Sequence, residues 1–319
     1  MPTVAVTDYT FPSLDIEEAI LRPLGVELIQ GQCKTAEALI PLVSRADAVL
    51  TQFAPVTAAV IAAMDKARVI VRYGIGVDNV DLEAARVKGI PVCNVPGFCI
   101  DEVADHTLAF ILATTRQVIQ NSLHVRAGKW GLAMPLDQMK TLRDQVVGIV
   151  GFGKIGREVA ARLAPFKCRR LAFDPVVSEA TIRAAGCEPA SLDALLAQAD
   201  IVTLHCPSTP QTRKLLNAKS LAQLKRGAIV INLGRGDLID TPALVAALES
   251  GQVGAAAIDV CDPEPIPLDS PLRSLPNVIT ASHIASASVK AVHTLRETAA
   301  NIAACALRGE TPPNIVNGV

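Results

Sequence analysis

The chain has 319 residues, half of them hydrophobic, and a formal net charge of −1 at pH 7. This near-neutral balance excludes an extended basic surface for nucleic acid or an anionic membrane, and aromatic residues, at 3%, are too few for a base-stacking platform. The length is sufficient for two domains of ordinary size, each with its own buried core.

The first hundred residues alternate short apolar runs with helix-like segments. The runs that we expect to form buried parallel strands lie at 4–8, 26–30, 48–52, 69–74 and 91–95. The segments with helical periodicity between them lie at 12–24, 35–44, 57–65 and 81–89, and several begin near a serine, threonine or aspartate suited to capping. This alternation predicts βαβ units and a doubly wound α/β sheet.

Residues 101–127 contain no proline or glycine and have an amphipathic pattern, which predicts one long helix connecting two domains. An irregular surface stretch is expected over 128–145, after which the strand–helix alternation resumes. The second set of expected strands lies at 146–151, 169–174, 200–206, 228–234, 255–260 and 277–282. Residues 284–308 are alanine-rich and are predicted to form a helix that returns to the first domain.

A glycine-punctuated stretch, VGIVGFGKIGREVA, lies almost halfway along the chain. Gly151, Gly153 and Gly156 have the spacing G-x-G-x-x-G between an expected strand and an expected helix. In that context the glycines permit a tight turn, a close approach to a pyrophosphate and close helix–strand packing, while the helix N-terminus offers amide hydrogens to phosphates. The alternative interpretation is a glycine-rich turn that binds nothing.

The next strand carries a second signal for the same ligand. It ends in Asp174, where a carboxylate can accept hydrogen bonds from the ribose hydroxyls and would repel a 2′-phosphate. Alone, Asp174 could be a turn residue before Pro175. The two signals in register predict a bound dinucleotide and favour NAD over NADP.

Three of the expected strands in the second half of the chain are each followed by a side chain suited to chemistry. These are Arg235 between two glycines, Glu264 in a proline-rich loop and His283. Taken singly, each has an ordinary explanation, such as a surface ion pair, a solvated carboxylate or a structural histidine. Together, at strand ends of one cofactor-binding sheet, they predict a site beside the nicotinamide.

The three side chains suit hydride transfer between NAD(H) and a 2-hydroxy or 2-oxo acid. The Arg235 guanidinium can hold a carboxylate through two hydrogen bonds and polarise the adjacent carbonyl. The His283 imidazole can give a proton to the substrate oxygen or take it in the reverse direction. A carboxylate beside it, Glu264, stabilises the charged imidazolium.

At this point the sequence resembles the D-isomer-specific 2-hydroxyacid dehydrogenases over nearly its whole length. The motifs that carry the resemblance are, in order, VRYGIGVDNVD (71–81), GIPVCNVPGFCIDEVADHTLAFIL (89–112), VGIVGFGKIGREVA (147–160), LHCPSTPQTRKLLN (204–217), NLGRGDLID, AAAIDVCDPEP and SHIAS. Within the family the chain looks closest to phosphoglycerate-dehydrogenase-like enzymes and to the dehydrogenase domain of C-terminal-binding-protein corepressors.

The resemblance implies an NAD-binding Rossmann domain, residues 101–284, inserted into a flavodoxin-like substrate domain made of residues 1–100 and 285–319. It implies a homodimer built through the nucleotide domains and the long helix. The catalytic residues that it implies are Arg235, Glu264 and His283. The cofactor-binding positions that it implies are Gly151, Gly153, Lys154, Ile155, Gly156, Asp174, Cys206, Pro207, Thr212, Leu233, Gly234, Arg235, Asp259 and His283. The substrate-binding positions that it implies are Arg72, Tyr73, Gly74, Ile75 and Gly76, where backbone amides would hold the substrate carboxylate, together with Arg235 and His283.

Some positions depart from the family pattern. Gly234 stands where alanine usually precedes the arginine, and we expect a slightly looser turn there. Glu264 stands where the formate dehydrogenases of the superfamily have glutamine, which argues against that reaction. Because the chain ends at VNGV, we expect no appended regulatory domain of the kind found in some phosphoglycerate dehydrogenases.

The remaining expectations concern location, metals and the class of function. The N-terminus lacks the features of a signal peptide, and no apolar run reaches the length of a membrane span. None of the eight cysteines is in a Cys-x-x-Cys pair or a zinc-type cluster with histidine, so we expect reduced thiols, no bound metal and a cytoplasmic protein. The leading hypothesis is an NAD-dependent dehydrogenase of a small 2-hydroxy acid. The alternative is an NAD(H)-sensing, corepressor-like interaction protein with little required catalysis.

Overall fold

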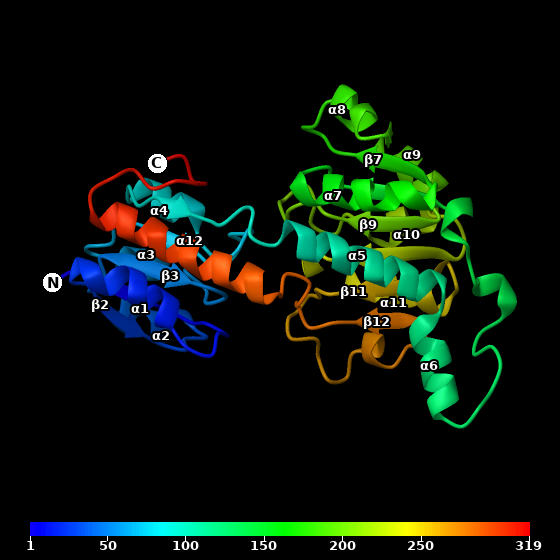
Figure 1. Ribbon diagram of the computed structural model, residues 1–319, viewed down its shortest axis with the longest axis horizontal. Helices are drawn as coiled ribbons and strands as arrows, with labels where there is room; N and C mark the ends of the chain where they lie inside the picture. The colour runs from blue at the N-terminus through cyan, green and yellow to red at the C-terminus, as the bar shows by residue number, and fades with distance from the viewer. The chain divides into compact units, whose positions relative to one another are not determined.

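A computed structural model describes residues 1–319 and divides them into two compact units. Unit 1 contains Met1–Phe98 and Ser288–Val319, and unit 2 contains Cys99–Ala287. Each unit is built around one parallel sheet with helices packed against it (Figure 1). The predicted α/β class with two doubly wound parallel sheets is therefore confirmed.

Unit 1 has five parallel strands in the flavodoxin-like order β2-β1-β3-β4-β5. These strands are β1 (Thr3–Val6), β2 (Glu27–Gln30), β3 (Ala48–Thr51), β4 (Ile70–Arg72) and β5 (Val92–Cys93). The helices of the unit are α1 (Asp15–Leu21), α2 (Ala36–Val43), α3 (Ala58–Ala62), α4 (Leu82–Val87) and α12 (Val289–Leu307), with a 3₁₀ turn η1 (Arg22–Leu24). The helix expected over 284–308 is thus present as α12 and belongs to this unit.

The strands of unit 1 bury both of their faces, as their continuous apolar runs predict. Along β1, Val4 and Val6 face a core shared with α1 and α12, whereas Ala5 faces a second core shared with α2, α3 and α4. All three residues are fully buried. A parallel sheet covered on both sides leaves its strand ends as the natural place for a ligand.

Unit 2 has seven parallel strands in the order β12-β11-β10-β9-β6-β7-β8, which is the Rossmann order with one added strand. The strands are β6 (Val146–Val150), β7 (Arg169–Phe173), β8 (Glu188–Pro189), β9 (Ile201–Leu204), β10 (Ala228–Asn232), β11 (Val253–Ile258) and β12 (Val278–Thr280). The helices are α5 (Ile100–Thr115), α6 (Val118–Arg126), α7 (Lys154–Leu163), α8 (Glu179–Ala184), α9 (Leu192–Gln198), α10 (Ala218–Gln223) and α11 (Thr241–Glu249). The 3₁₀ turns are η2 (Leu136–Gln138), η3 (Leu142–Asp144), η4 (Ala164–Phe166), η5 (Gly236–Leu238) and η6 (Pro271–Arg273).

The prediction of one continuous helix over 101–127 is wrong. The segment forms two helices, α5 and α6, separated at Gln117, which has a left-handed backbone with φ of 54°. The carbonyl of Thr115 accepts a hydrogen bond from the amide of Lys140 at 2.9 Å, a partner supplied by the returning chain instead of by the next helical turn. The Thr115 hydroxyl bonds back to the Ile111 carbonyl at 2.7 Å. The break therefore depends on a distant residue and has no glycine or proline signal.

Two findings bear on the chemistry of the whole chain. None of the eight cysteines forms a disulfide bond. Among the helices, none combines the length and the apolar character needed to cross a membrane.

Candidate active site

The glycine turn of unit 2 is closely packed on one side and open on the other. A Cβ atom on Gly151, which has φ of 90°, would overlap the backbone at Cys206, and one on Gly156 would overlap the Gly151 carbonyl. A Cβ on Gly153 would meet nothing within 4 Å. Gly153 also caps α7, so the first amides of that helix and the exposed Lys154 border the open side. This arrangement fits a dinucleotide pyrophosphate.

Asp174 lies in the turn after β7 and is joined directly to the glycine turn. Its Oδ2 accepts a hydrogen bond from the Phe152 amide at 2.7 Å, and its Oδ1 accepts from the amides of Val176 at 2.9 Å and Val177 at 3.1 Å. The side chain is half-buried, and each oxygen has further acceptor capacity. The structure therefore holds the acidic side chain directly against the glycine turn.

The loop after β9 contains three of the predicted cofactor positions. Cys206 lies against Gly151, and burial raises the pKa of its thiol to about 11, so it is uncharged at neutral pH. The Thr212 hydroxyl donates to the Pro207 carbonyl at 2.6 Å and accepts from the Thr209 amide at 2.8 Å. These bonds hold the loop in a compact turn beside the glycines.

Glu264 and His283 form a hydrogen-bonded pair at the strand ends of β11 and β12. His283 Nδ1 lies 3.0 Å from Glu264 Oε2, with about a third of each side chain exposed. Burial would raise the pKa of Glu264, but the hydrogen bond and charge of His283, together with the Cys261 amide and the Arg235 charge, outweigh it and lower that pKa. Glu264 is therefore a carboxylate at neutral pH. Since Nδ1 faces the carboxylate, Nε2 is the ring nitrogen on the side away from Glu264.

Asp259 supports the turn that carries His283. The Asp259 carbonyl accepts the His283 amide at 2.7 Å, and the two carboxylate oxygens accept the amides of Ile284 and Ala285, each at 2.9 Å. Asp259 is only 2% exposed, and His283 has a left-handed backbone with φ of 57°. The turn is thus held by a buried carboxylate from the neighbouring strand.

The Arg235 turn is braced by Asn232, a residue that the sequence analysis missed. The Asn232 side chain accepts the Gly234 amide at 3.0 Å and donates to the Arg235 carbonyl at 2.9 Å. These bonds oppose the loosening expected from Gly234. A Cβ on Gly236 would overlap the backbone at Cys261, so only glycine lets this turn lie against the Glu264 loop. The sequence signal for these contacts was the single polar residue, an asparagine, at the end of an otherwise apolar expected strand.

Asp237, a second residue that the sequence analysis missed, connects the loop after β9 to the Arg235 turn. Asp237 Oδ2 accepts a hydrogen bond from the Ser208 hydroxyl at 2.6 Å and lies 3.3 Å from Arg213 Nε. Its main-chain carbonyl accepts the Lys214 amide at 2.7 Å. The sequence around Asp237 gave no local sign of this contact, because its partners follow a different strand.

In unit 1, the YGIG loop after β4 presents backbone amides. The Gly74 carbonyl accepts the Val95 amide at 2.9 Å, and the Ile75 carbonyl accepts Asn94 Nδ2 at 2.6 Å. The amides of residues 75–77 donate no hydrogen bond within the chain, and the three residues are partly exposed. Consecutive main-chain amides of this kind can donate hydrogen bonds to an anion. The Arg72 side chain lies over Gly74, where a Cβ would overlap it.

The predicted residues therefore form two groups. Unit 2 brings the glycine turn, Asp174 and the 206–212 loop together, and it joins Glu264 to His283 beside the Arg235 turn. Unit 1 holds Arg72 at the end of β4, and Tyr73, Gly74, Ile75 and Gly76 in the loop that follows.

Comparisons with known proteins agree with this geometry. A sequence model of the D-isomer specific 2-hydroxyacid dehydrogenase NAD-binding domain matches residues 108–285. The chain is 39% identical over 322 residues to a D-3-phosphoglycerate dehydrogenase of Mycobacterium leprae, covering 99% of this chain and 59% of that protein. It is 37% identical over 297 residues to a glyoxylate reductase of Korarchaeum cryptofilum, covering 92% and 87%.

The fold comparison extends over the whole chain. A crystal structure of D-lactate dehydrogenase from Aquifex aeolicus, complexed with NAD and lactic acid, superposes with a TM-score of 0.90 at 25% identity and covers 99% of both chains. By contrast, this chain spans about three fifths of the length of the mycobacterial relative.

Proposed function

The chain belongs to the D-isomer specific 2-hydroxyacid dehydrogenase family, and we propose that it interconverts a small D-2-hydroxy acid and the corresponding 2-oxo acid. The cofactor of the family's nucleotide domain is NAD, whose nicotinamide supplies or accepts the hydride when bound. The observation that carries the proposal is the 3.0 Å contact between His283 Nδ1 and a Glu264 carboxylate whose pKa is lowered.

In the reducing direction, His283 gives the proton from Nε2 to the substrate oxygen while C2 receives the hydride. The C2–O double bond becomes a single bond, so one hydride and one proton account for the hydroxy acid formed. Glu264 stabilises the imidazolium before transfer and fixes the ring through Nδ1. Asp259 holds the turn so that the ring keeps this orientation. In the oxidising direction the neutral ring takes the proton back.

The substrate carboxylate has two candidate partners. Arg235 is held by the Asn232 brace and offers a planar guanidinium for two parallel hydrogen bonds. The amides of residues 75–77 offer neutral donors, and the nearby Arg72 adds positive charge to the same loop. Each of these groups is complementary to a carboxylate.

The decisive measurement is oxidation of NADH in the presence of glyoxylate, hydroxypyruvate, pyruvate or a bulkier 2-oxo acid. The loss of NADH absorbance reports the rate. We expect turnover with at least one of them. Tight NADH binding without turnover of any member would overturn the enzyme proposal and favour the interaction-protein alternative.

The preference for NAD is assigned to Asp174, since its carboxylate lies beside the glycine turn and would repel a 2′-phosphate. Asp174→Ala should weaken NADH binding more than NADPH binding in a fluorescence titration. Equal losses for the two cofactors would contradict the ribose contact.

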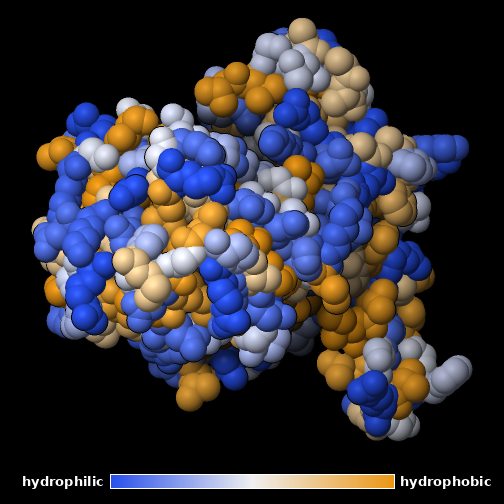
Figure 2. Space-filling view, turned by 60° about the vertical axis from the view of Figure 1, so that its left-hand side comes forward, coloured by the Kyte–Doolittle hydropathy of each residue, from blue (hydrophilic) through white to orange (hydrophobic).

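We further propose that the protein is a homodimer through α6 and the segment after it. No residue of α6 is buried, and several of its exposed side chains are apolar. Val118, Leu123 and Val125 are 49–60% exposed, and Trp130, beyond the helix, is 92% exposed. Figure 2 shows hydrophobic surface on the projecting segment at its lower right, where Figure 1 places α6. Exposed apolar side chains without a partner in their own chain fit a contact with a second copy.

Light scattering tests this assembly. The wild-type protein should have twice the chain mass of 33.5 kDa. Leu123→Glu should reduce the mass to that of one chain, whereas Val87→Glu, at a 75% exposed valine in unit 1, should not. A wild-type monomer would refute the dimer without affecting the catalytic proposal.

A further inference from the structure

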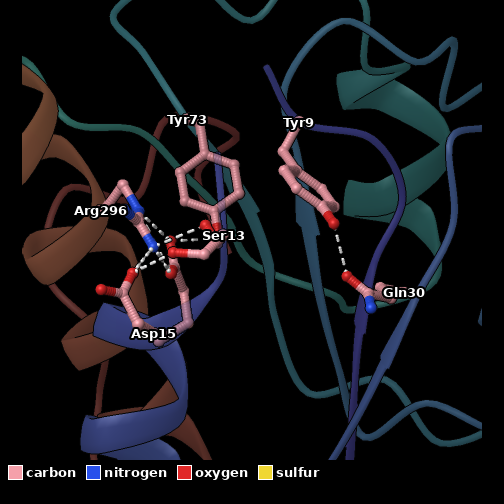
Figure 3. A network of polar contacts seen from close by, with 7 residues as sticks. Tyr9, Ser13, Asp15, Gln30, Tyr73 and Arg296 are labelled. Atoms are coloured by element: carbon pink, nitrogen blue, oxygen red, sulfur yellow. Dashed lines mark hydrogen bonds and ion pairs between the residues drawn. The ribbon is translucent and has the colours of Figure 1, made fainter. Parts of the chain in front are cut away.

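A buried ion pair links the two ends of unit 1. Glu17 of α1 is completely buried and Arg296 of α12 is 4% exposed. Figure 3 shows Arg296 beside Ser13 and Asp15 in this network. Arg296 Nη2 lies 2.7 Å from Glu17 Oε2, and Arg296 Nε lies 3.1 Å from Oε1. Nη2 also donates to the Ser13 carbonyl and to Asp15 Oδ1, each at 2.8 Å. Because removing two charges from water is costly, this pair depends on its hydrogen bonds being well satisfied.

The third member of the network is Tyr73, which lies 56 residues from Glu17 in the sequence. Its hydroxyl donates to Glu17 Oε1 at 3.1 Å. Burial, and next the charge of Glu17, raise the pKa of Tyr73 well above its ordinary value, so the hydroxyl remains a donor. The ring edge meets Phe11 at 5.3 Å between centroids, and the Arg296 guanidinium lies over the same Phe11 ring at 5.0 Å.

Tyr73 is also the first residue of the loop that presents the amides of 75–77. Its own amide donates to the Thr51 carbonyl at 2.8 Å, which fixes the start of the loop on the sheet. The Tyr73 side chain points into the network with Glu17 and Arg296 (Figure 3). The loop is therefore held by its backbone on one side and by a buried hydroxyl on the other.

We propose that Glu17 and Arg296 are positioning residues that aim the 75–77 amides at the substrate carboxylate by holding the Tyr73 hydroxyl. The inference rests on the proposed function, because it concerns how the same substrate group is bound. Glu17 and Arg296 do not touch the substrate in this arrangement. Their effect passes through the Tyr73 ring to the backbone that begins at Gly74.

The test uses the chain's only two tyrosines as a matched pair. Tyr73→Phe removes the hydroxyl bonded to Glu17, and Tyr9→Phe removes a hydroxyl that donates to Gln30 Oε1 at 2.6 Å elsewhere in unit 1. We expect Tyr73→Phe to raise the KM for the 2-oxo acid about threefold to tenfold, while kcat and the Kd for NADH stay within about twofold. Tyr9→Phe should change none of the three.

A spectroscopic measurement provides a second readout that needs no turnover. The Tyr9→Phe protein labelled with [ζ-¹³C]tyrosine has a single tyrosine signal, from Tyr73. We expect that signal to shift when oxamate, an unreactive analogue of a 2-oxo acid, saturates the NADH complex. Glu17→Gln, which keeps the side-chain shape but removes the charge, should change the starting position of the signal and raise the KM in the same sense as Tyr73→Phe.

The outcomes separate this inference from the proposed function. If the wild-type protein turns over a 2-oxo acid but Tyr73→Phe leaves its KM unchanged and lowers only the Tm, the network serves packing and the positioning role is wrong. A Tyr73 signal that oxamate binding does not move would also overturn it. Failure of the wild-type protein to turn over any 2-oxo acid would instead overturn the proposed function, and this inference with it.

Discussion

The strand ends of the two sheets present different chemistry. In unit 2 they carry reactive side chains, and His283 and Glu264 meet at 3.0 Å. In unit 1 the loop after β4 presents main-chain amides, which no substitution other than proline removes directly. Function in unit 2 should therefore be sensitive at the reactive residue itself. Function in unit 1 should be sensitive at residues that shape the backbone, including residues distant in sequence.

The largest effect is expected in unit 2, from His283→Ala. Loss of the proton donor should lower kcat by about 10²- to 10⁴-fold, while NADH binding, measured by fluorescence, is retained. Retention of binding shows that the fold is intact. A kcat reduced less than about tenfold would mean that another group supplies the proton.

Glu264→Gln should have the next largest effect and a distinct pH signature. The pKa of Glu264 is lowered in the folded protein, so its charge is present above its ordinary pKa and is lost only as the pH falls through the lowered value. The wild-type carboxylate is therefore charged throughout a neutral pH series. In the glutamine variant we expect kcat to fall about tenfold or more, and reduction of the 2-oxo acid to fade at a lower pH, because a neutral amide stabilises the imidazolium less.

The pH series is measured on both proteins with saturating NADH. The same upper pH limit for the two proteins would show that Glu264 only orients the ring.

In unit 1, Gly74→Ala changes the backbone loop without removing any functional group. Gly74 has φ of 152°, and a Cβ there would overlap the Arg72 guanidinium. We expect the KM for the 2-oxo acid to rise about tenfold with a smaller change in kcat. Gly97→Ala is the matched control, because a Cβ there meets nothing within 4 Å. Equal KM values for the two variants would show that the loop does not bind the substrate.

The smallest effect is expected at the exposed edge of the Arg296 network. The hydrogen bonds from Ser13 and Arg296 lower the pKa of Asp15 from 3.8 to about 2. A lowered folded-state pKa stabilises the protein above the unfolded value, and this contribution is lost as the pH falls towards 2. Asp15→Asn should therefore lower the Tm slightly near neutral pH, and the difference should shrink between pH 4 and pH 2. A Tm difference independent of pH would contradict this ionic contribution.

Much of unit 2 could be predicted because its signals are local in the sequence. The glycine spacing lies within one strand–turn–helix segment, and Arg235, Glu264 and His283 each follow an apolar strand. Parallel strands bring their carboxyl ends to one edge of a sheet, so residues far apart in the chain meet there. The braces Asn232 and Asp237 were missed because their roles depend on the fine path of the turns.

By itself, the sequence determined the α/β class, both sheet domains, the dinucleotide turn and the family, since apolar periodicity and short motifs encode these. Only the tertiary structure decided the break at Gln117, where the Lys140 amide donates a hydrogen bond to the Thr115 carbonyl. It alone also joined Arg296 to Glu17, 279 residues earlier, and both to the Tyr73 loop. Buried polar side chains select their partners by proximity in the folded core, and that proximity has no periodic signal along the chain.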